Sequence, residues 1–396
     1  MRRALAIAAL LVVAAIGACR MFLPQRFAVN TPLSGMLLGA KPPPKSELEK
    51  RMVLPPGFEL TLFADGISNA RFLRFTSAGD LLVSSPREGT VFLLERDANG
   101  DGRADGVRKL LTGLDKPHGL EFAGDWLYVA ETGAVKRVRF DAAARATSGP
   151  VETVLPGLPT GGNHWTKTIR LGPDGWMYLS MGSTCNVCLE TEPRRATLAR
   201  FKLDGSGYET VATGLRNSVG FDWRPADGAL YATDNGRDLL GDDIPPCELN
   251  KIEPGKFYGW PFLYGMNQLD PDFGSQIGDK LASAVPPAHA FGAHVAPLGM
   301  RFYRGDKFPA RYRGQAFVAE HGSWNRTAKS GYKVVLLEWG ADGAISESDF
   351  LTGFEVDEGV IGRPVDVLDG PDGALYVSDD FAGAVYRVTY GGGAGR

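Results

Sequence analysis

The sequence predicts an all-β fold, and specifically a six-bladed β-propeller. The chain of 396 residues contains 51 glycines and 26 prolines, an excess that is typical of a protein with many turns. A motif of two short apolar strands joined by a turn recurs six times along the chain. Most copies lie about 45 to 60 residues apart, which is enough for one four-stranded blade each.

All copies of the motif share one design. A short apolar strand leads into a turn that contains glycine or aspartate, and a second apolar strand ends in small or polar residues. The Pro-Asp-Gly turns at 173–175 and 371–373 are strong hairpin signals. The copies occupy 72–85, 119–132, 169–183, 219–236, 299–322 and 365–380.

The segments between the copies complete the blades. The strand at 58–63 precedes the first copy and has no blade of its own, so we expect it to pair with the last blade and close the ring. The long interval at 245–296 is expected to be mostly loop and to roof one side of a central pocket. Further strand-like segments lie at 91–96, 135–140, 198–203, 334–339 and 384–389.

The N-terminal residues are expected to lie outside the fold. A positive Arg2-Arg3 pair precedes an apolar stretch at 4–16 that is too short for a comfortable membrane span, as in a signal peptide. The stretch ends in IGAC, similar to the processing box of bacterial lipoproteins, in which Cys19 would be lipidated. An ordinary signal peptide or an uncleaved anchor is the alternative. We therefore expect an exported protein, periplasmic or membrane-anchored as a lipoprotein, divided into a signal peptide at 1–19, a tether at 20–54 and the propeller at 55–392.

Charge and cysteine usage narrow the chemistry. A formal net charge of −3 and the lack of a basic run argue against nucleic acid as a partner. Cys185 and Cys188 form a CxxC pair, which can be redox-active or half of a zinc site, but no second pair follows at zinc spacing. In an exported protein a local structural disulfide is the favoured interpretation. Cys247 is left without an assigned role.

A short acidic segment resembles the first part of a calcium-binding loop. Oxygen-bearing side chains alternate around a central glycine, but Arg108 stands where an EF-hand would place its bidentate glutamate. A peripheral structural calcium site is the favoured interpretation, and a polar turn is the alternative. The residues concerned are Asp97, Asn99, Asp101 and Asp105.

The repeat also predicts where polar side chains meet. In a blade, the start of the innermost strand and the end of the next strand lie on the same face, so residues at these positions surround the central channel. They include four of the five histidines, His118, His164, His294 and His321, and the arginines Arg216, Arg237, Arg326 and Arg363. Guanidinium groups suit carboxylates or phosphates, and histidine supplies a base near neutral pH. We therefore expect a site for an anionic ligand on this face.

Several enzyme classes are excluded by missing motifs. The sequence has no nucleophile elbow, no glycine-rich phosphate loop after a strand and no HExxH motif. A serine hydrolase, a nicotinamide-dependent enzyme and a zinc protease are therefore not expected.

From about residue 54 to 390, the chain resembles the soluble quinoprotein aldose dehydrogenases and, more closely, their sorbosone-dehydrogenase-like relatives. The motifs that carry the resemblance agree in order and spacing. They are GGNHW at 161–165, GLRNSVG at 214–220, DNGRD at 234–238, HGSWNR at 321–326 and GRPVDV at 362–367.

The resemblance implies a six-bladed propeller that holds pyrroloquinoline quinone (PQQ) over its channel, with calcium beneath it. His164 stands where the family has its general base, which takes the proton of the substrate hydroxyl as hydride passes to the quinone C5. Arg216 stands where an arginine polarises the quinone oxygens, and Asn217 where its cofactor-binding neighbour lies. Arg363 matches an arginine that binds a cofactor carboxylate.

The resemblance also implies a calcium site built from backbone. Gly236 and Arg237 match the pair whose carbonyl oxygens bind the ion, and a backbone ligand tolerates a change of side chain.

Two departures affect the cofactor site. Val365 stands where the better-known glucose dehydrogenases have a second arginine, and their cofactor-binding lysine in blade five has no clear counterpart. Lys167 is expected either at the channel wall or in the pocket. By position alone, we place His118, His321, Trp324, Asn325 and Arg326 at the cofactor.

The predicted activity is therefore PQQ-dependent oxidation of an aldose or a sugar-derived aldehyde, with an unidentified electron acceptor. One alternative is a calcium-dependent lactonase-like hydrolase that uses Asp234, Asn217, Glu131 and Asp379. The other is a propeller without catalytic activity that binds a glycan or a protein.

Overall fold

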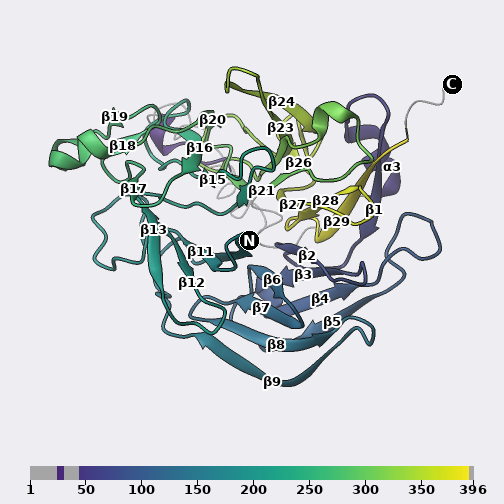
Figure 1. Cartoon of the computed structure of the whole chain (residues 1–396). Coiled ribbons are helices and arrows are strands. Elements are labelled where there is room, and N and C mark those ends of the chain that lie inside the picture. Colours follow the sequence, from purple (N-terminus) through teal and green to yellow (C-terminus); the bar gives the residue numbers. More distant parts are fainter. Residues whose placement is uncertain (1–24, 31–43, 392–396) are drawn as a thin grey trace, which may run out of the picture.

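A computed structural model describes residues 25–30 and 44–391. The expected signal peptide and Cys19 lie outside these residues. Within the described ranges, no helix is long and apolar enough to cross a membrane. Strands dominate, and they form blades around a central axis, as Figure 1 shows in a view along that axis.

Six sheets form the ring, which confirms the predicted propeller. Blade 1 comprises β2 (Leu73–Phe75), β3 (Leu81–Ser85), β4 (Thr90–Leu94) and β5 (Val107–Leu111). Blade 2 comprises β6 (Leu120–Ala123), β7 (Trp126–Ala130), β8 (Val135–Asp141) and β9 (Ala146–Leu155). Blade 3 comprises β10 (Lys167–Leu171), β11 (Met177–Met181), β12 (Thr197–Phe201), β13 (Glu209–Thr213) and the short parallel β17 (Lys256–Phe257).

The remaining blades follow in chain order. Blade 4 comprises β14 (Phe221–Trp223), β15 (Leu230–Asp234), β16 (Pro246–Ile252) and β20 (His289–Ala293). Blade 5 comprises β21 (Pro297–Phe302), β22 (Ala316–Glu320), β23 (Lys333–Trp339) and β24 (Ile345–Leu351). Blade 6 comprises β27 (Pro364–Asp369), β28 (Leu375–Asp379), β29 (Ala384–Tyr390) and β1 (Phe58–Ala64).

The ring is closed by strands from the two ends of the propeller. β1 pairs antiparallel with β29, with Phe58 opposite Tyr390 and Leu62 opposite Tyr386. The expected closure is thereby confirmed, and the outer edge of blade 6 is completed by the first strand of the propeller.

The long interval after the fourth repeat is more structured than expected. It supplies the two outer strands of blade 4, β16 and β20, and the strand β17 that extends blade 3. Most of the interval still lies outside strands, as expected, and its strands were not predicted because they lie far apart in sequence and lack the hairpin spacing of the repeat. Between them lie the hairpin β18 (Leu263–Tyr264) with β19 (Gln268–Leu269) and the 3-10 turns η3 (Gly274–Gln276) and η4 (Gly278–Ser283).

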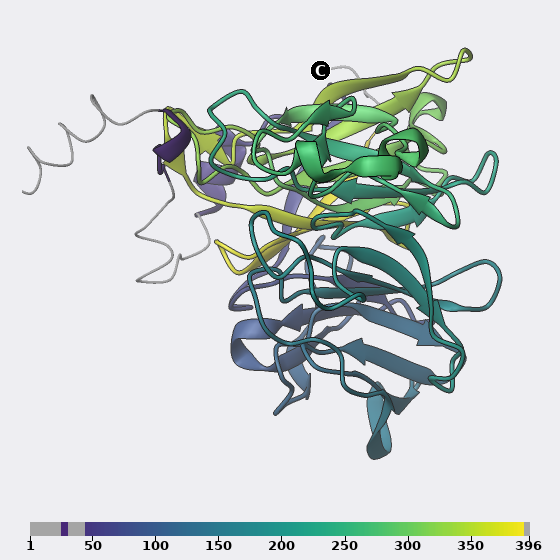
Figure 2. The ribbon, with the colours of Figure 1, turned by 90° about the vertical axis from the view of Figure 1, so that its left-hand side faces the viewer.

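Parts of the expected tether contact the propeller. The turn η1 (Gln25–Phe27) and residues up to Asn30 lie against the loop after β22, where Asn325 donates to the carbonyl oxygens of Arg26 and Ala28. The helix α3 (Lys45–Arg51) is followed by Val53, which forms an isolated antiparallel β-bridge with Thr352, directly after the last strand of blade 5. Figure 2 shows η1 on the left, at one end of the propeller axis. Smaller elements are η2 (Pro86–Glu88), η5 (Ala310–Tyr312), β25 (Glu355–Val356) and β26 (Gly359–Val360).

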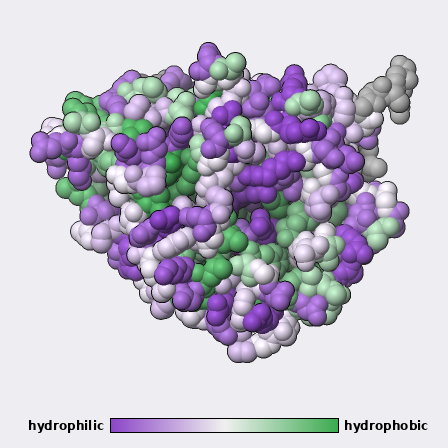
Figure 3. All heavy atoms as spheres, in the orientation of Figure 1, coloured by the Kyte–Doolittle hydropathy of each residue, from purple (hydrophilic) through white to green (hydrophobic). Residues whose placement is uncertain are grey.

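Charged residues of alternating sign follow one another on the innermost strands. Arg170 lies 3.3 Å from Asp222 on the next blade, and Asp222 also binds Arg304 at 2.7 Å. Asp222 is 2% exposed, so its several arginine partners offset the cost of burying its charge. The full series from blade 1 to blade 6 is Arg74, Glu121, Arg170, Asp222, Arg301 and Asp369. Figure 3 shows hydrophilic side chains gathered around the middle of the face on which these strands end.

Candidate active site

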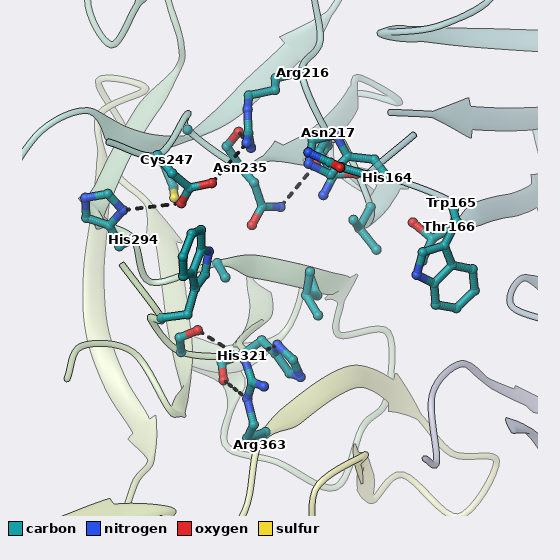
Figure 4. Close-up of a pocket in the computed structure, with 18 of the residues that line it drawn as sticks. His164, Trp165, Thr166, Arg216, Asn217, Asn235, Cys247, His294, His321 and Arg363 are labelled. Atoms are coloured by element: carbon teal, nitrogen blue, oxygen red, sulfur yellow. Dashed lines mark hydrogen bonds and ion pairs between the residues drawn. The ribbon is translucent and has the colours of Figure 1, made fainter. Parts of the chain in front are cut away.

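A cavity of about 260 Å³ opens at the other face, where the innermost strands begin. Its walls come from blades 1, 3, 4, 5 and 6, and Figure 4 shows the side chains facing one another across it. The predicted site residues that line it are His164, Arg216, Asn217, Gly236, His294, His321, Trp324 and Arg363. As the repeat predicted, these residues come together on one face of the ring.

His164 precedes β10 and is held through one ring nitrogen. Its Nδ1 lies 2.9 Å from Ser183 Oγ and 3.0 Å from the Ser183 carbonyl oxygen. The Ser183 hydroxyl donates to the carbonyl oxygen of Cys185 at 2.7 Å, so Oγ can only accept from the imidazole. Nδ1 therefore carries the proton, and the lone pair is at Nε2.

Burial and charge keep this imidazole neutral. Desolvation, followed by the positive charge of Arg216, lowers the pKa of His164 to about 3. The backbone next to it is closely packed, since a Cβ on Gly182 would lie 2.6 Å from His164 Cβ and 2.6 Å from Asn217 Oδ1. A neutral imidazole with a free lone pair suits a general base.

Arg216 precedes the first strand of blade 4, also lines the cavity and is 5% exposed. Its Nε donates to the carbonyl oxygen of Asn186 at 2.9 Å, and Nη2 donates to Asn186 Oδ1 at 2.9 Å. Nη1 donates to the Asn235 carbonyl oxygen at 3.0 Å, and Asp238 lies 3.3 Å from Nη2. The guanidinium is thus fixed, and it presents a positive charge to the cavity.

A second group of charges lies on the blade 6 side. Arg363 Nη2 donates to His321 Nδ1 at 2.9 Å, and His321 Nε2 donates to Asp380 at 2.9 Å. Asp380 also accepts from Arg71 Nη1 at 2.8 Å. Because both nitrogens of His321 are engaged, this histidine positions Arg363 and is not available as a base. Figure 4 shows His321 beside Arg363, across the cavity from Arg216.

Two features near the blade 4 wall could accept a ligand. Asn217 Oδ1 is buried and has no hydrogen-bond partner within the part of the chain that the structure describes. The backbone of Gly236 borders the cavity, and a Cβ there would lie 2.8 Å from the Pro246 carbonyl oxygen. Glycine is therefore required at this position, and it leaves backbone rather than side chain toward the ligand.

The structure corrects four predicted cofactor contacts, because their side chains do not line the cavity. The guanidinium of Arg237 is held 2.7 Å from Asp270 and 2.9 Å from Asp272, both in the blade 4 insertion. Arg326 binds Asp243 at 3.1 Å. In each case a carboxylate on a neighbouring loop, distant in sequence, attracts the arginine away from the axis.

Asn325 and His118 are also directed elsewhere. Asn325 is 1% exposed, accepts from the backbone of Leu239 and donates to the N-terminal segment 25–30. His118 is fully buried, with its ring 4.3 Å from that of Phe72. Desolvation holds the pKa of His118 well below its usual value. Trp324 does border the cavity, at its rim, and is 44% exposed.

Two functional neighbours were missed in the sequence. Asn186 holds Arg216, and buried Arg195 donates to the carbonyl oxygen of His164 at 2.9 Å. Their polar side chains are unremarkable in sequence. Arg71 directly precedes the first repeat, one of the positions expected around the channel, and it borders the cavity. Lys167 is fully buried in the channel wall, where its Nζ donates to the Trp165 carbonyl oxygen at 3.1 Å.

The structure shows the bonding state of the three described cysteines and the hydrogen bonds of the acidic segment. Cys185 and Cys188 form the predicted disulfide, and Cys247 is buried and unpaired. At 97–105 the side-chain oxygens accept from backbone N–H groups of the same loop, as Asp97 does from Gly100 and Gly102. In the described ranges, three clustered metal-ligating side chains occur only at Cys185, Cys188 and Glu190. The arrangement favours the polar turn over the peripheral calcium site.

Comparison with known proteins places these features in a family. A family model described as TrAA12-like matches residues 52–257 and 268–391. An uncharacterized protein of Borreliella burgdorferi is 32% identical over 87% of this chain and 92% of its own length. A pyrroloquinoline quinone-dependent sugar dehydrogenase of Hypocrea jecorina is 25% identical over 68% of this chain and 73% of its own. The aldose sugar dehydrogenase YliI of Escherichia coli is 26% identical over 59% of this chain and 62% of its own.

Solved structures agree in fold. A Trichoderma reesei protein of carbohydrate-active enzyme family AA12 superposes with a TM-score of 0.74 at 22% identity, covering 86% of this chain and 98% of that one. The holo PQQ domain of a Coprinopsis cinerea pyranose dehydrogenase gives a TM-score of 0.72 at 22% identity, covering 89% and 99%. These likenesses establish a shared propeller.

Proposed function

Because this chain belongs to the TrAA12-like family of PQQ-dependent sugar dehydrogenases, we propose that it oxidises an aldose or a sugar-derived aldehyde with bound PQQ. The observation that carries the proposal is the geometry at His164. Its Nδ1 is tied to Ser183, and no hydrogen bond to Nε2 is found among the described residues. The free nitrogen belongs to a wall of the arginine-lined cavity.

The residues present fit an anionic, planar cofactor. PQQ carries three carboxylates, and the cavity has guanidinium groups of Arg71, Arg216 and Arg363 on its walls. Arg71 Nε and Asn217 Oδ1 are buried without partners in the described structure, so donors and acceptors remain to be satisfied there. Val365, which replaces a family arginine, is fully buried in an apolar cluster with Phe72, Val219 and Leu298 and is not among the residues that line the cavity.

The chain's own residues would perform the proton chemistry. When bound, PQQ would supply the acceptor for the substrate's hydride. His164 Nε2 would accept the proton of the substrate hydroxyl, while Ser183 keeps the other ring nitrogen protonated. A carboxylate bound against Arg216 would offset the charge that lowers the pKa of His164, and would thereby strengthen the base.

Calcium would bind to backbone oxygens. The carbonyls of Gly236 and Arg237 are the expected ligands, and the side chain of Arg237 is turned away by Asp270. Gly236 is half-buried and borders the cavity, which fits such a role.

The lactonase-like alternative needs free carboxylates, and these are engaged. Asp234 accepts from the backbone N–H groups of Arg216 and Asn217. Asp379 accepts from the backbone N–H groups of Arg363, Phe381 and Ala382. These carboxylates are already hydrogen-bonded to the loops that carry Arg216 and Arg363, and this favours the dehydrogenase over a hydrolase that needs them as metal ligands.

Titration of the apo-protein with PQQ, with and without calcium, tests the proposal. The cofactor's absorbance would report saturable binding, and addition of a panel of aldoses and sugar aldehydes would then reduce it. Binding without reduction by any member would contradict the assigned substrate class. No binding in either condition would refute the proposed cofactor and direct attention to a lactone or glycan ligand.

A further inference from the structure

The loop closed by the Cys185–Cys188 disulfide lies against both residues that the proposed function places at the reaction centre. It begins directly after Ser183-Thr184 at the end of β11, and its Cα atoms at the two cysteines are 6.2 Å apart. The carbonyl oxygen of Cys185 accepts from Ser183 Oγ, the atom that accepts from His164 Nδ1. One end of the loop therefore sets the tautomer of His164.

The next residue, Asn186, holds Arg216 by two acceptors. Its carbonyl oxygen accepts from Nε and its side-chain Oδ1 accepts from Nη2, both at 2.9 Å. The donors belong to one planar guanidinium, so the pair fixes its orientation as well as its position.

Asn186 also ties this arginine to the loop that follows β15. Its Oδ1 accepts from the Asp238 N–H at 2.8 Å, and its Nδ2 donates to the Asp238 carbonyl oxygen at 3.0 Å. The amide side chain of Asn186 thus pairs with the N–H and the carbonyl of one residue, as backbone groups do between two β-strands. Asp238 lies two residues after Gly236, which borders the cavity.

We propose that the Cys185–Cys188 loop is a clamp that positions the active site, with Asn186 as the positioning residue for Arg216 and the Cys185 carbonyl as the group that fixes His164 through Ser183. The disulfide matters because two of these five contacts come from backbone carbonyls of the loop. A four-residue loop closed by a covalent bond has few alternative conformations, so these carbonyls stay directed at their partners. Asn186 touches neither substrate nor cofactor in this scheme and acts through Arg216.

Asn186→Ala is the first variant to measure. It removes the Oδ1 acceptor and the Nδ2 donor but keeps both cysteines. Any effect of this variant on catalysis depends on the proposed function being right. The first measurement is therefore one that requires no cofactor. Histidine NMR in the ligand-free protein follows the titration of His164, which the nearby charge of Arg216 influences. We expect the titration to move when Arg216 is released, and PQQ affinity to fall about tenfold or more.

Three further variants complete the design. Val187→Ala, in the same loop, is the matched control and should leave both readouts at the wild-type values. Asn186→Asp keeps an oxygen acceptor facing Arg216 and should restore part of the affinity lost in Asn186→Ala. Cys185→Ser with Cys188→Ser opens the loop and should shift the His164 titration, because the Cys185 carbonyl is no longer confined.

The outcomes separate the two proposals. A shifted His164 titration in Asn186→Ala, in a protein whose wild type fails to bind PQQ, supports the clamp and refutes the cofactor assignment. Wild-type titration and wild-type PQQ affinity in Asn186→Ala would overturn the clamp. Wild-type behaviour of the double serine variant would show that the disulfide contributes nothing to it.

Discussion

The guanidinium of Arg195 donates a hydrogen bond to the backbone carbonyl oxygen of His164 at 2.9 Å. The same group donates to the carbonyl oxygens of Gly182 and Gly161, so one buried side chain ties three segments around the candidate base. Arg195 is 2% exposed and Gly182 is buried, so at least the Gly182 carbonyl depends on this donor for its hydrogen bond.

Replacement of Arg195 by lysine should therefore disturb His164. A single ammonium cannot reach three carbonyls, and each buried acceptor left unpaired costs about 1–3 kcal/mol. We expect kcat to fall about tenfold or more, with a lower free energy of unfolding measured by chemical denaturation. Arg194→Lys is the matched control, since Arg194 pairs with Glu192 outside the cavity. Equal losses in the two variants would show that Arg195 has no special role.

Removal of the base should affect turnover far more than binding. His164→Asn deletes the Nε2 acceptor, and general-base catalysis contributes about 10²–10⁴ in rate. We expect kcat to fall within that range while PQQ affinity changes little, as measured by steady-state kinetics and cofactor titration. His289→Asn is the control, because His289 lies on the outer strand of blade 4 and binds Glu347 of blade 5. A fully active His164→Asn enzyme would end the assignment.

The protonation of His164 provides a test that needs no substrate. Burial first, and Arg216 second, lower its pKa to about 3, so its imidazole should stay neutral until the pH approaches that value. The titration is measurable by histidine NMR in the ligand-free protein. Arg216→Gln removes one cause and should raise the pKa toward its ordinary value. A normal pKa in the wild-type protein would contradict the buried geometry.

The charge series around the channel predicts a pH-dependent stability. Asp222 is buried against Arg170, Arg301 and Arg304, and despite its desolvation these arginines lower its pKa to about 2. A depressed carboxyl pKa stabilises the fold at pH values above the unfolded pKa of about 3.9, and this contribution is lost as the pH falls toward 2.

Asp222→Asn should accordingly destabilise the propeller at neutral pH by about 3–5 kcal/mol, because it leaves buried arginines without their counter-charge. The difference from the wild type should shrink as the pH is lowered, in denaturation curves recorded between neutral and acidic pH. Asp227→Asn removes an exposed partner of Arg224 and should cost less than about 1 kcal/mol. A constant difference at every pH would argue against the ion pairs as its cause.

The fold and the site were predictable to different degrees. Strand pairs and hairpin turns are local, so the repeat gave the six blades, and the unpaired strand at 58–63 indicated how the ring closes. The same rule placed residues such as His164 and Arg363 on the cavity face. Whether a residue stands at the start or the end of a strand can be read from the local sequence, and this position determines on which face of the propeller the residue lies.

The direction of each side chain could not be predicted in the same way. Arg237 and Arg326 stand at suitable positions, yet Asp270 and Asp243 bind them outside the cavity. Which carboxylate meets which arginine depends on how the long insertion folds, and no local pattern contains that information. Asn186 and Arg195 were missed for the same reason, since their partners are 13 to 52 residues away.

The pairing of β1 with β29 brings the two ends of the propeller together, and the Gly391 N–H donates to the Gly57 carbonyl oxygen at 3.0 Å. A short linker could therefore join these ends, and the chain could be opened instead in an exposed loop between two blades. Such a circular permutant would preserve every blade and the cavity while giving new termini to another part of the ring. The order of the blades in space, rather than the point at which the polypeptide starts, is what the architecture requires.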